Sequence, residues 1–154
     1  MSQISFLASS KIIELPDEIN EYNKRRVFER AEDFMHFYVK EVDEYWGNEV
    51  KDLFSLPYIY EVIGLGNQLF LTYLEKYMEI GDVLEIYHVR NQHALLKYKR
   101  SMLENPQPIE VNVGNLTYRD VYGLYQLNPK KWVDELSHRN YFTERGITTF
   151  VNYS

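Results

Sequence analysis

The stretch of residues 24–47 constrains the fold more than any other part of the sequence. Large or apolar side chains recur through it, at Val27, Phe28, Ala31, Phe34, Met35, Tyr38, Val39, Val42, Tyr45 and Trp46. At about 100° per residue these positions fall on one arc roughly 140° wide, which is typical of an amphipathic helix. Gly47 follows as a helix-ending residue. The sequence therefore predicts one long amphipathic helix over residues 24–46, about 33 Å long at about 1.5 Å per residue.

Most of the remaining chain favours strands. Runs rich in aromatic and β-branched residues, separated by turn-forming residues, are residues 4–13, 58–63, 69–78, 83–89, 109–113, 116–127 and 146–153. Short helices are predicted over residues 91–104 and after Asn128. We therefore expect an α+β fold with a single domain over residues 1–154. Its curved antiparallel sheet of about five to seven strands would pack against the long helix and several shorter ones.

Composition narrows the class of protein further. With 154 residues, of which 45% are hydrophobic, the chain matches one domain with a core of ordinary size. It has no cysteine, so it contains neither a disulfide framework nor a thiolate metal site. No apolar run approaches the roughly 20 residues needed to cross a bilayer, and the N-terminus lacks the basic start of a signal peptide. We expect a cytoplasmic protein that does not associate with membranes.

The net charge of −6 is concentrated in the first third of the chain. Residues 14–52 contain twelve acidic and six basic side chains, so that this segment alone accounts for the whole excess. An acidic surface disfavours nucleic acid as a partner and favours a basic protein through electrostatic steering. The alternative is that the acidic groups only keep the chain soluble.

The polar side of the predicted helix carries the candidate partner-binding residues. They are Glu29, Asp33, His36, Phe37, Lys40, Asp43 and Glu44. A large aromatic side chain, Phe37, surrounded by charged groups has the composition of a binding hot spot with a polar rim. The alternative is that a neighbouring loop or strand covers Phe37, which would leave the charged groups simply hydrated.

A second candidate site lies at the end of the predicted strand over residues 83–89. It consists of Tyr87, His88, Arg90, Asn91 and His93. Polar side chains at the junction of a strand and a loop are well placed to line a ligand site. If this site were catalytic, a histidine would act as general acid or base and Arg90 would hold an anion. No nucleophile is marked nearby.

Metal and cofactor sites have no support in the sequence. Glu32 and His36 are spaced to meet on one helix face, but they supply only two ligands where zinc takes three or four. The residues 64–66 are Gly-Leu-Gly and lack the rest of a dinucleotide-binding loop, and no phosphate-binding P-loop is present. We expect no metal and no cofactor.

These observations favour a small non-catalytic protein that binds a basic protein partner through its acidic helix face. Its surface character resembles that of immunity or antitoxin proteins that neutralise a basic toxin. The alternative is a small enzyme or ligand-binding domain with a tyrosine-lined cleft near residues 88–93, since the chain has 14 tyrosines. A third possibility is a homo-oligomer that buries the tyrosine-bearing face of its sheet between identical chains.

Overall fold

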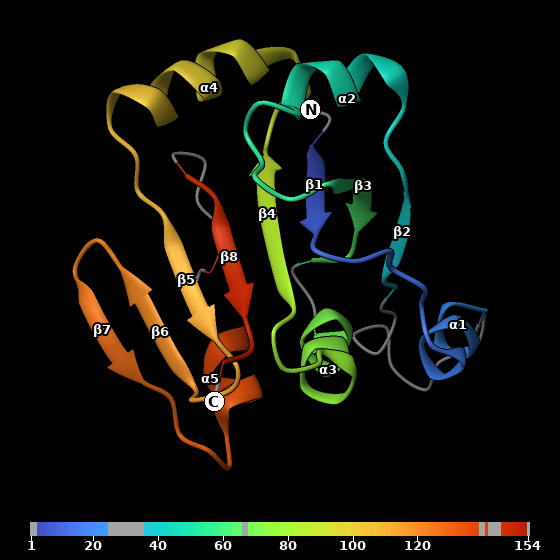
Figure 1. Ribbon diagram of the computed structural model, residues 1–154, viewed down its shortest axis with the longest axis vertical. Coiled ribbons are helices and arrows are strands. Elements are labelled where there is room, and N and C mark those ends of the chain that lie inside the picture. The colour runs from blue at the N-terminus through green and yellow to red at the C-terminus, as the bar shows by residue number, and fades with distance from the viewer. Residues whose placement is uncertain (1–2, 25–35, 66–67, 139–140, 142–145, 154) are drawn as a thin grey trace.

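One mixed sheet organises the molecule, as the computed structural model of residues 3–24, 36–65, 68–138, 141 and 146–153 shows (Figure 1). Its strands are β1 (Ile4–Ser9), β2 (Tyr38–Glu41), β3 (Tyr58–Ile63), β4 (Val83–Val89), β5 (Ile109–Asn112), β6 (Thr117–Asp120), β7 (Gly123–Gln126) and β8 (Thr148–Val151). They lie in the order β2-β3-β1-β4-β8-β5-β6-β7. The helices are α1 (Asp17–Lys24), α2 (Glu44–Val50), α3 (Gln68–Tyr77), the 3-10 helix η2 (Gln92–Ala94), α4 (Leu95–Glu104) and α5 (Trp132–Ser137).

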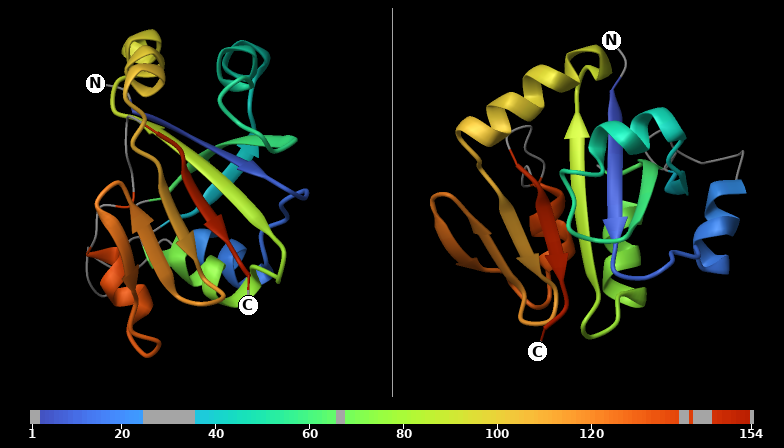
Figure 2. Two further views of the ribbon diagram at one scale, coloured as in Figure 1. Left: turned by 60° about the vertical axis from the view of Figure 1, so that its left-hand side comes forward. Right: turned by 45° about the horizontal axis from the view of Figure 1, so that its top comes forward.

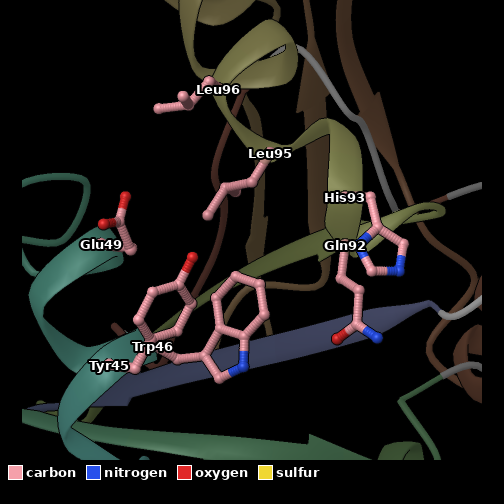
Figure 3. A pocket seen from close by; sticks show the side chains of 7 residues that line it. All are labelled: Tyr45, Trp46, Glu49, Gln92, His93, Leu95 and Leu96. Carbon is pink, nitrogen blue, oxygen red and sulfur yellow. The ribbon is translucent and has the colours of Figure 1, made fainter.

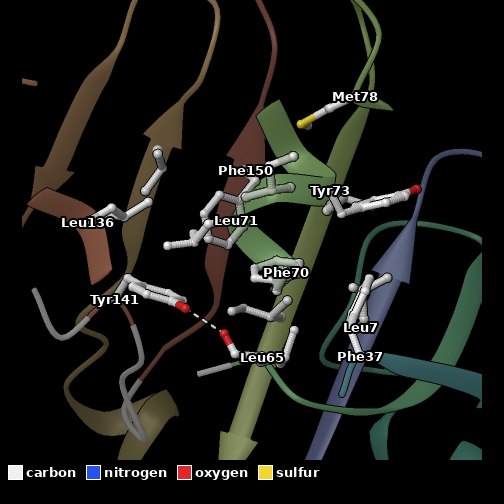
Figure 4. Packing of buried hydrophobic residues seen from close by; sticks show 14 of the residues in the cluster. Leu7, Phe37, Leu65, Phe70, Leu71, Tyr73, Met78, Leu136, Tyr141 and Phe150 are labelled. Carbon is white, nitrogen blue, oxygen red and sulfur yellow. Dashed lines mark hydrogen bonds between the residues drawn. The ribbon is translucent and has the colours of Figure 1, made fainter. Parts of the chain in front are cut away.

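Helices cover both faces of this sheet. Because successive side chains of a strand point to opposite faces, Leu7 packs on one side and Phe6 on the other. Leu7 belongs to a large apolar cluster with residues of α1, α3 and α5, which Figure 4 shows around Phe70 and Phe150. Phe6 belongs to a smaller cluster with residues of α2 and α4. The left view of Figure 2 shows these two groups of helices on opposite sides of the sheet.

The long helix predicted over residues 24–46 is not formed. Residues 25–35 lie outside the described part of the chain, Tyr38–Glu41 is strand β2, and α2 begins separately at Glu44. Along residues 37–40 the exposure alternates, with Phe37 buried and Val39 half-buried between more exposed neighbours. In a strand, such alternation turns the apolar side chains toward the core, just as an apolar arc does in a helix, so the local pattern is compatible with both. Pairing with β3, in which Val39 lies opposite Val62, decides in favour of the strand.

Two other segments also differ from the expected strands. Residues 69–78, expected to be a strand, instead lie in α3 as far as Tyr77, where the buried side chains Phe70, Tyr73 and Leu74 recur at spacings of three and four residues. Residues 116–127, expected to be one return strand, form the β6–β7 hairpin. Its β7 begins at Gly123, whose φ of 150° favours glycine.

The α+β class is confirmed, whereas the pairing and the number of strands are not as expected. The described residues form eight strands of the sheet, and β5 runs parallel to β8, with Val111 opposite Phe150. Parallel neighbours need a crossover connection, and the β6–β7 hairpin together with α5 lies between these two strands in the sequence. Among the described residues, none of the helices has the length and apolar character needed to cross a bilayer.

Helix α1 is fastened to the start of β2 by one buried side chain. The Asn23 amide donates to the Phe37 carbonyl at 2.7 Å, and its Oδ1 accepts the Phe37 N–H at 2.9 Å. The Tyr38 hydroxyl donates to the Asn23 carbonyl at 3.0 Å. Asn23 thus satisfies both backbone groups of Phe37, as a neighbouring strand would. This contact orients the entry to β2 and, through it, to α2.

Candidate functional site

A hollow of about 430 Å³ lies between α2 and the η2–α4 segment and is a candidate site, which we call the α2–α4 pocket. It is lined by Tyr45, Trp46, Glu49, Gln92, His93, Leu95 and Leu96. Figure 3 shows the two aromatic rings extending from α2, with Leu95 and Leu96 across from them and Gln92 and His93 at one side. Its volume lies within the range of about 300–1,000 Å³ that is usual for ligand sites.

The wall formed by α2 is fixed by a helix cap and by ring packing. Asp43 is the N-cap of α2, and its Oδ1 accepts the Trp46 N–H at 2.9 Å. The Trp46 ring lies on Phe6 of β1, with the ring centroids 6.1 Å apart. Tyr45 meets Trp46 edge to face at 5.0 Å and is 65% exposed. The pocket therefore presents one anchored indole and one accessible phenol ring.

The opposite wall begins at the end of β4. The Asn91 side chain caps η2 by accepting the His93 N–H at 3.0 Å, which places Gln92 and His93 at the rim. Leu95 is buried beneath the pocket and Leu96 is exposed. These residues reach the pocket because α4 follows η2 directly.

A lysine links the two walls. Lys99 of α4 donates to the Glu49 carbonyl at 2.6 Å and lies 3.2 Å from an Asp52 carboxylate oxygen. Its charged group is thereby held against the C-terminal end of α2, where a cation complements the helix dipole. This bridge sets the spacing between α2 and α4, and hence the width of the pocket.

The lining groups are suited to a ligand with a positive charge on an apolar stem. The Tyr45 and Trp46 rings can contact a cation through their faces, and the Glu49 carboxylate can accept hydrogen bonds from it. Leu95 and Leu96 supply apolar surface for the stem. An arginine or lysine side chain combines these properties.

The predicted partner-binding residues do not share one helix face in the described structure. Glu29 and Asp33 lie outside the described residues. Phe37 is buried, with its ring centroid 5.4 Å from that of Phe70. The structure therefore supports the interpretation that neighbouring parts of the chain cover Phe37, and not the interpretation that Phe37 is an exposed binding residue.

The other members of that set lie on β2 or close to its ends. His36 stacks on Tyr38, with ring centroids 5.4 Å apart. The Lys40 Nζ lies 3.5 Å from a carboxylate oxygen of Glu61. Asp43 caps α2, and Glu44 is its first residue. Only these last two belong to the element that forms the α2–α4 pocket.

The second predicted set, Tyr87, His88, Arg90, Asn91 and His93, is divided among three environments. Tyr87 is buried in the smaller apolar cluster, under α2 and α4. The His88 Nδ1 lies 2.6 Å from the Ser5 hydroxyl, and strand alternation places it on the opposite face of the sheet. Arg90 is exposed, Asn91 caps η2, and His93 alone lines the pocket. These five residues therefore do not converge on one centre.

Another hollow in the described structure, of about 370 Å³, is lined by residues that include Lys11, Glu14 and Tyr73. Lys11 is hydrogen-bonded to Asp82 at 2.8 Å, which raises its pKa, and burial raises the pKa of Tyr73. Both groups therefore stay protonated at neutral pH and supply no base. Within the described residues, no three potential metal ligands gather at one point.

Comparison with known proteins does not identify a function. No protein-family model matches the chain, and no curated protein or solved structure is significantly similar to it. The geometry of the α2–α4 pocket therefore carries the functional inference. Sequence reasoning had placed Tyr45 and Trp46 on a core-facing helical arc and had assigned no role to Glu49. The signal in the sequence that could have identified this pocket is the pair of adjacent aromatic residues, Tyr45 and Trp46.

Proposed function

We propose that this protein binds a partner protein by receiving a basic side chain of that partner in the α2–α4 pocket. The observation that carries the proposal is the placement of two aromatic rings, Tyr45 and Trp46, beside the Glu49 carboxylate. Aromatic residues at the centre of an accessible hollow are typical anchors of protein interfaces. The proposal keeps the basic partner expected from the sequence and assigns no chemical reaction to the pocket.

The charges around the pocket favour one orientation of such a partner. Carboxylates are concentrated along the end of β2 and along α2, at Glu41, Asp43, Glu44, Glu49 and Asp52. The α4 wall carries exposed Lys97 and Arg100. A basic segment of the partner would therefore lie over α2, and any acidic residue flanking it would lie toward α4.

Calorimetric titration with short peptides tests the proposal. The probe is a peptide whose only charge is a single arginine side chain, and its control is the same peptide with citrulline, which keeps the shape and removes the charge. The arginine peptide should bind the wild-type protein and the citrulline peptide should bind more weakly. Equal binding of the two peptides would contradict a site that recognises positive charge.

Two substitutions locate the binding on the molecule. Glu49→Gln keeps the shape of the side chain and should weaken arginine-peptide binding about fivefold, the effect of one partly solvated charge pair. Tyr45→Ala should weaken it about two- to fivefold through the loss of a cation–π contact. Glu104→Gln, which removes an exposed carboxylate at the end of α4, is the matched control and should leave binding unchanged.

A small cationic molecule is a second candidate ligand for the same pocket. The volume of about 430 Å³ and the presence of His93 and Gln92 at the rim favour it, because they supply hydrogen-bonding groups that would orient a small ligand. Titration with arginine amide alone separates the two candidates. If this small molecule binds as tightly as the peptide, the pocket is a small-molecule site. If the peptide binds much more tightly, contacts outside the pocket contribute and a protein partner is favoured.

A further inference from the structure

The two edge strands of the sheet differ in their protection against pairing with another chain. Strand β2, at one end of the strand order, carries the exposed charged residues Lys40 and Glu41. Strand β7, at the other end, has the sequence Gly-Leu-Tyr-Gln and contains neither charge nor proline. Charged residues and proline are the usual means by which an edge strand avoids recruiting a further strand. Strand β7 therefore has the properties of a pairing edge.

The backbone direction along β7 can be derived from a hydrogen bond just beyond its end. The Leu127 N–H donates to the Leu116 carbonyl at 2.7 Å, on the side of β6. Backbone groups of successive strand residues alternate in direction, so those of Tyr125 also point to β6. The N–H and C=O groups of Leu124 and Gln126 consequently point away from β6, toward the outer edge of the described sheet.

The side chains of the hairpin add apolar surface to that edge. Tyr122 in the turn is 84% exposed and Leu124 is 57% exposed. Tyr125 is 39% exposed, and its ring lies 6.2 Å from that of Tyr118, centroid to centroid. Because successive strand residues point to opposite faces, Leu124 and Tyr125 supply exposed apolar surface on both sides of this edge, which favours an interaction surface.

We propose that two copies of this chain associate by antiparallel pairing of β7 with β7 across a two-fold axis, which joins their sheets. In the register that places Tyr125 opposite Tyr125 of the partner, Leu124 lies opposite the partner's Gln126. Both Leu124–Gln126 pairs then exchange the outward N–H and C=O groups derived above. An antiparallel edge of this kind is complementary to itself, as a two-fold interface requires.

Charge complementarity favours a second copy over an unrelated strand. Antiparallel pairing places the turn before β7, which follows Asp120, beside the segment that follows the partner's β7. That segment carries Lys130 and Lys131. Asp120 of one copy and Lys130 of the other therefore lie toward the same end of the pairing, and β7 itself introduces no like-charge repulsion.

Analytical ultracentrifugation of a charge-swap pair tests the proposal. The wild-type protein should sediment with twice the chain mass of 18.5 kDa in a concentration-dependent manner. Tyr125→Lys and Tyr125→Glu each place like charges opposite one another across the axis, so each variant alone should be monomeric. An equal mixture of the two variants should recover the dimer, which also shows that both are folded.

A matched control separates this edge from a general effect of the substitution. Tyr58→Lys changes a tyrosine of similar exposure, 40%, on the inner strand β3 and should leave the dimer intact. A wild-type protein that stays monomeric at all accessible concentrations would overturn the proposal. So would a dimer that survives Tyr125→Lys, or a variant mixture that remains monomeric, because either result would place the contact on another surface.

Discussion

Replacing Asn23 should destabilise the protein far more than its position on a short helix indicates. Its buried side chain makes both hydrogen bonds to the backbone of Phe37, at 2.7 and 2.9 Å. Asn23→Ala leaves a buried N–H and a buried C=O without these partners, and each unsatisfied group costs about 1–3 kcal/mol. The two costs together predict a loss of about 2–6 kcal/mol in the free energy of unfolding, a large share of the stability of an ordinary domain.

Urea denaturation followed by circular dichroism measures this loss. The matched control is Asn48→Ala, the same substitution at an exposed position of α2, which should change the free energy of unfolding by less than about 0.5 kcal/mol. If Asn23→Ala were no more destabilising than Asn48→Ala, the Asn23 contact would not hold α1 to β2, and the argument for the entry to β2 would fail.

The variant Asn23→Asp adds a dependence on pH. Its carboxylate would face the Phe37 carbonyl, whereas the protonated acid can donate a hydrogen bond to it. The folded state therefore raises the pKa of the new group above its unfolded value of about 3.9. A raised pKa means that the folded state binds the proton more tightly, so the loss of stability relative to wild type is full at neutral pH and shrinks as the pH falls through the raised pKa. A loss that does not vary with pH would contradict this geometry.

Two further perturbations address other contacts. Tyr141→Phe removes the buried bond that the hydroxyl donates to the Leu65 carbonyl at 2.5 Å, and urea denaturation should show a loss of about 1–3 kcal/mol; an unchanged midpoint would contradict the contact. Hydrogen bonds from Lys76 and Tyr77 hold the pKa of Glu18 below its ordinary value, so Lys76→Met should raise that pKa toward the ordinary value. In the wild type, ionised Glu18 stabilises the folded protein at neutral pH, and this stabilisation is lost as the pH falls through the pKa of Glu18 in the folded state. The pKa is measured by an NMR titration of the Glu18 carboxyl carbon, and an unchanged pKa in the variant would refute this origin of the shift.

Elements with one unambiguous local pattern could be predicted from the sequence. The alternating run at Ile109–Asn112 and the β-branched run at Tyr58–Ile63 are strands, both close to the expected bounds. Their hydrophobic period and their turn residues agree, so that local preference and tertiary packing select the same structure.

The segment around β2 could not be predicted because two periods overlap there. Tyr38, Val39 and Val42 fit the apolar arc of a helix, yet Phe37 and Val39 alternate with more exposed residues as a strand requires. The choice is made by partners distant in sequence, since Asn23 satisfies the backbone of Phe37 and β3 pairs along β2. Tertiary contacts thus overrode a local pattern that had seemed decisive.

The α2–α4 pocket was beyond sequence reasoning for a related reason. Trp46 and His93 meet only because β1, β3 and β4 bring the ends of distant segments to one face of the sheet. The sequence identified His93 and the acidic character of the first third of the chain. It did not indicate that Tyr45 and Trp46, read as core residues, form the lining of a pocket.

The central claim is that the α2–α4 pocket receives a basic side chain, and the two tryptophans of the chain make a direct test possible. Trp46 lines the pocket, whereas Trp132 is buried in the cluster on the opposite face of the sheet. In a ¹⁵N NMR titration with the arginine peptide, the indole N–H signal of Trp46 should shift progressively and that of Trp132 should not. If neither signal moves while the peptide binds, or if only Trp132 responds, the binding site lies elsewhere and the claim is wrong.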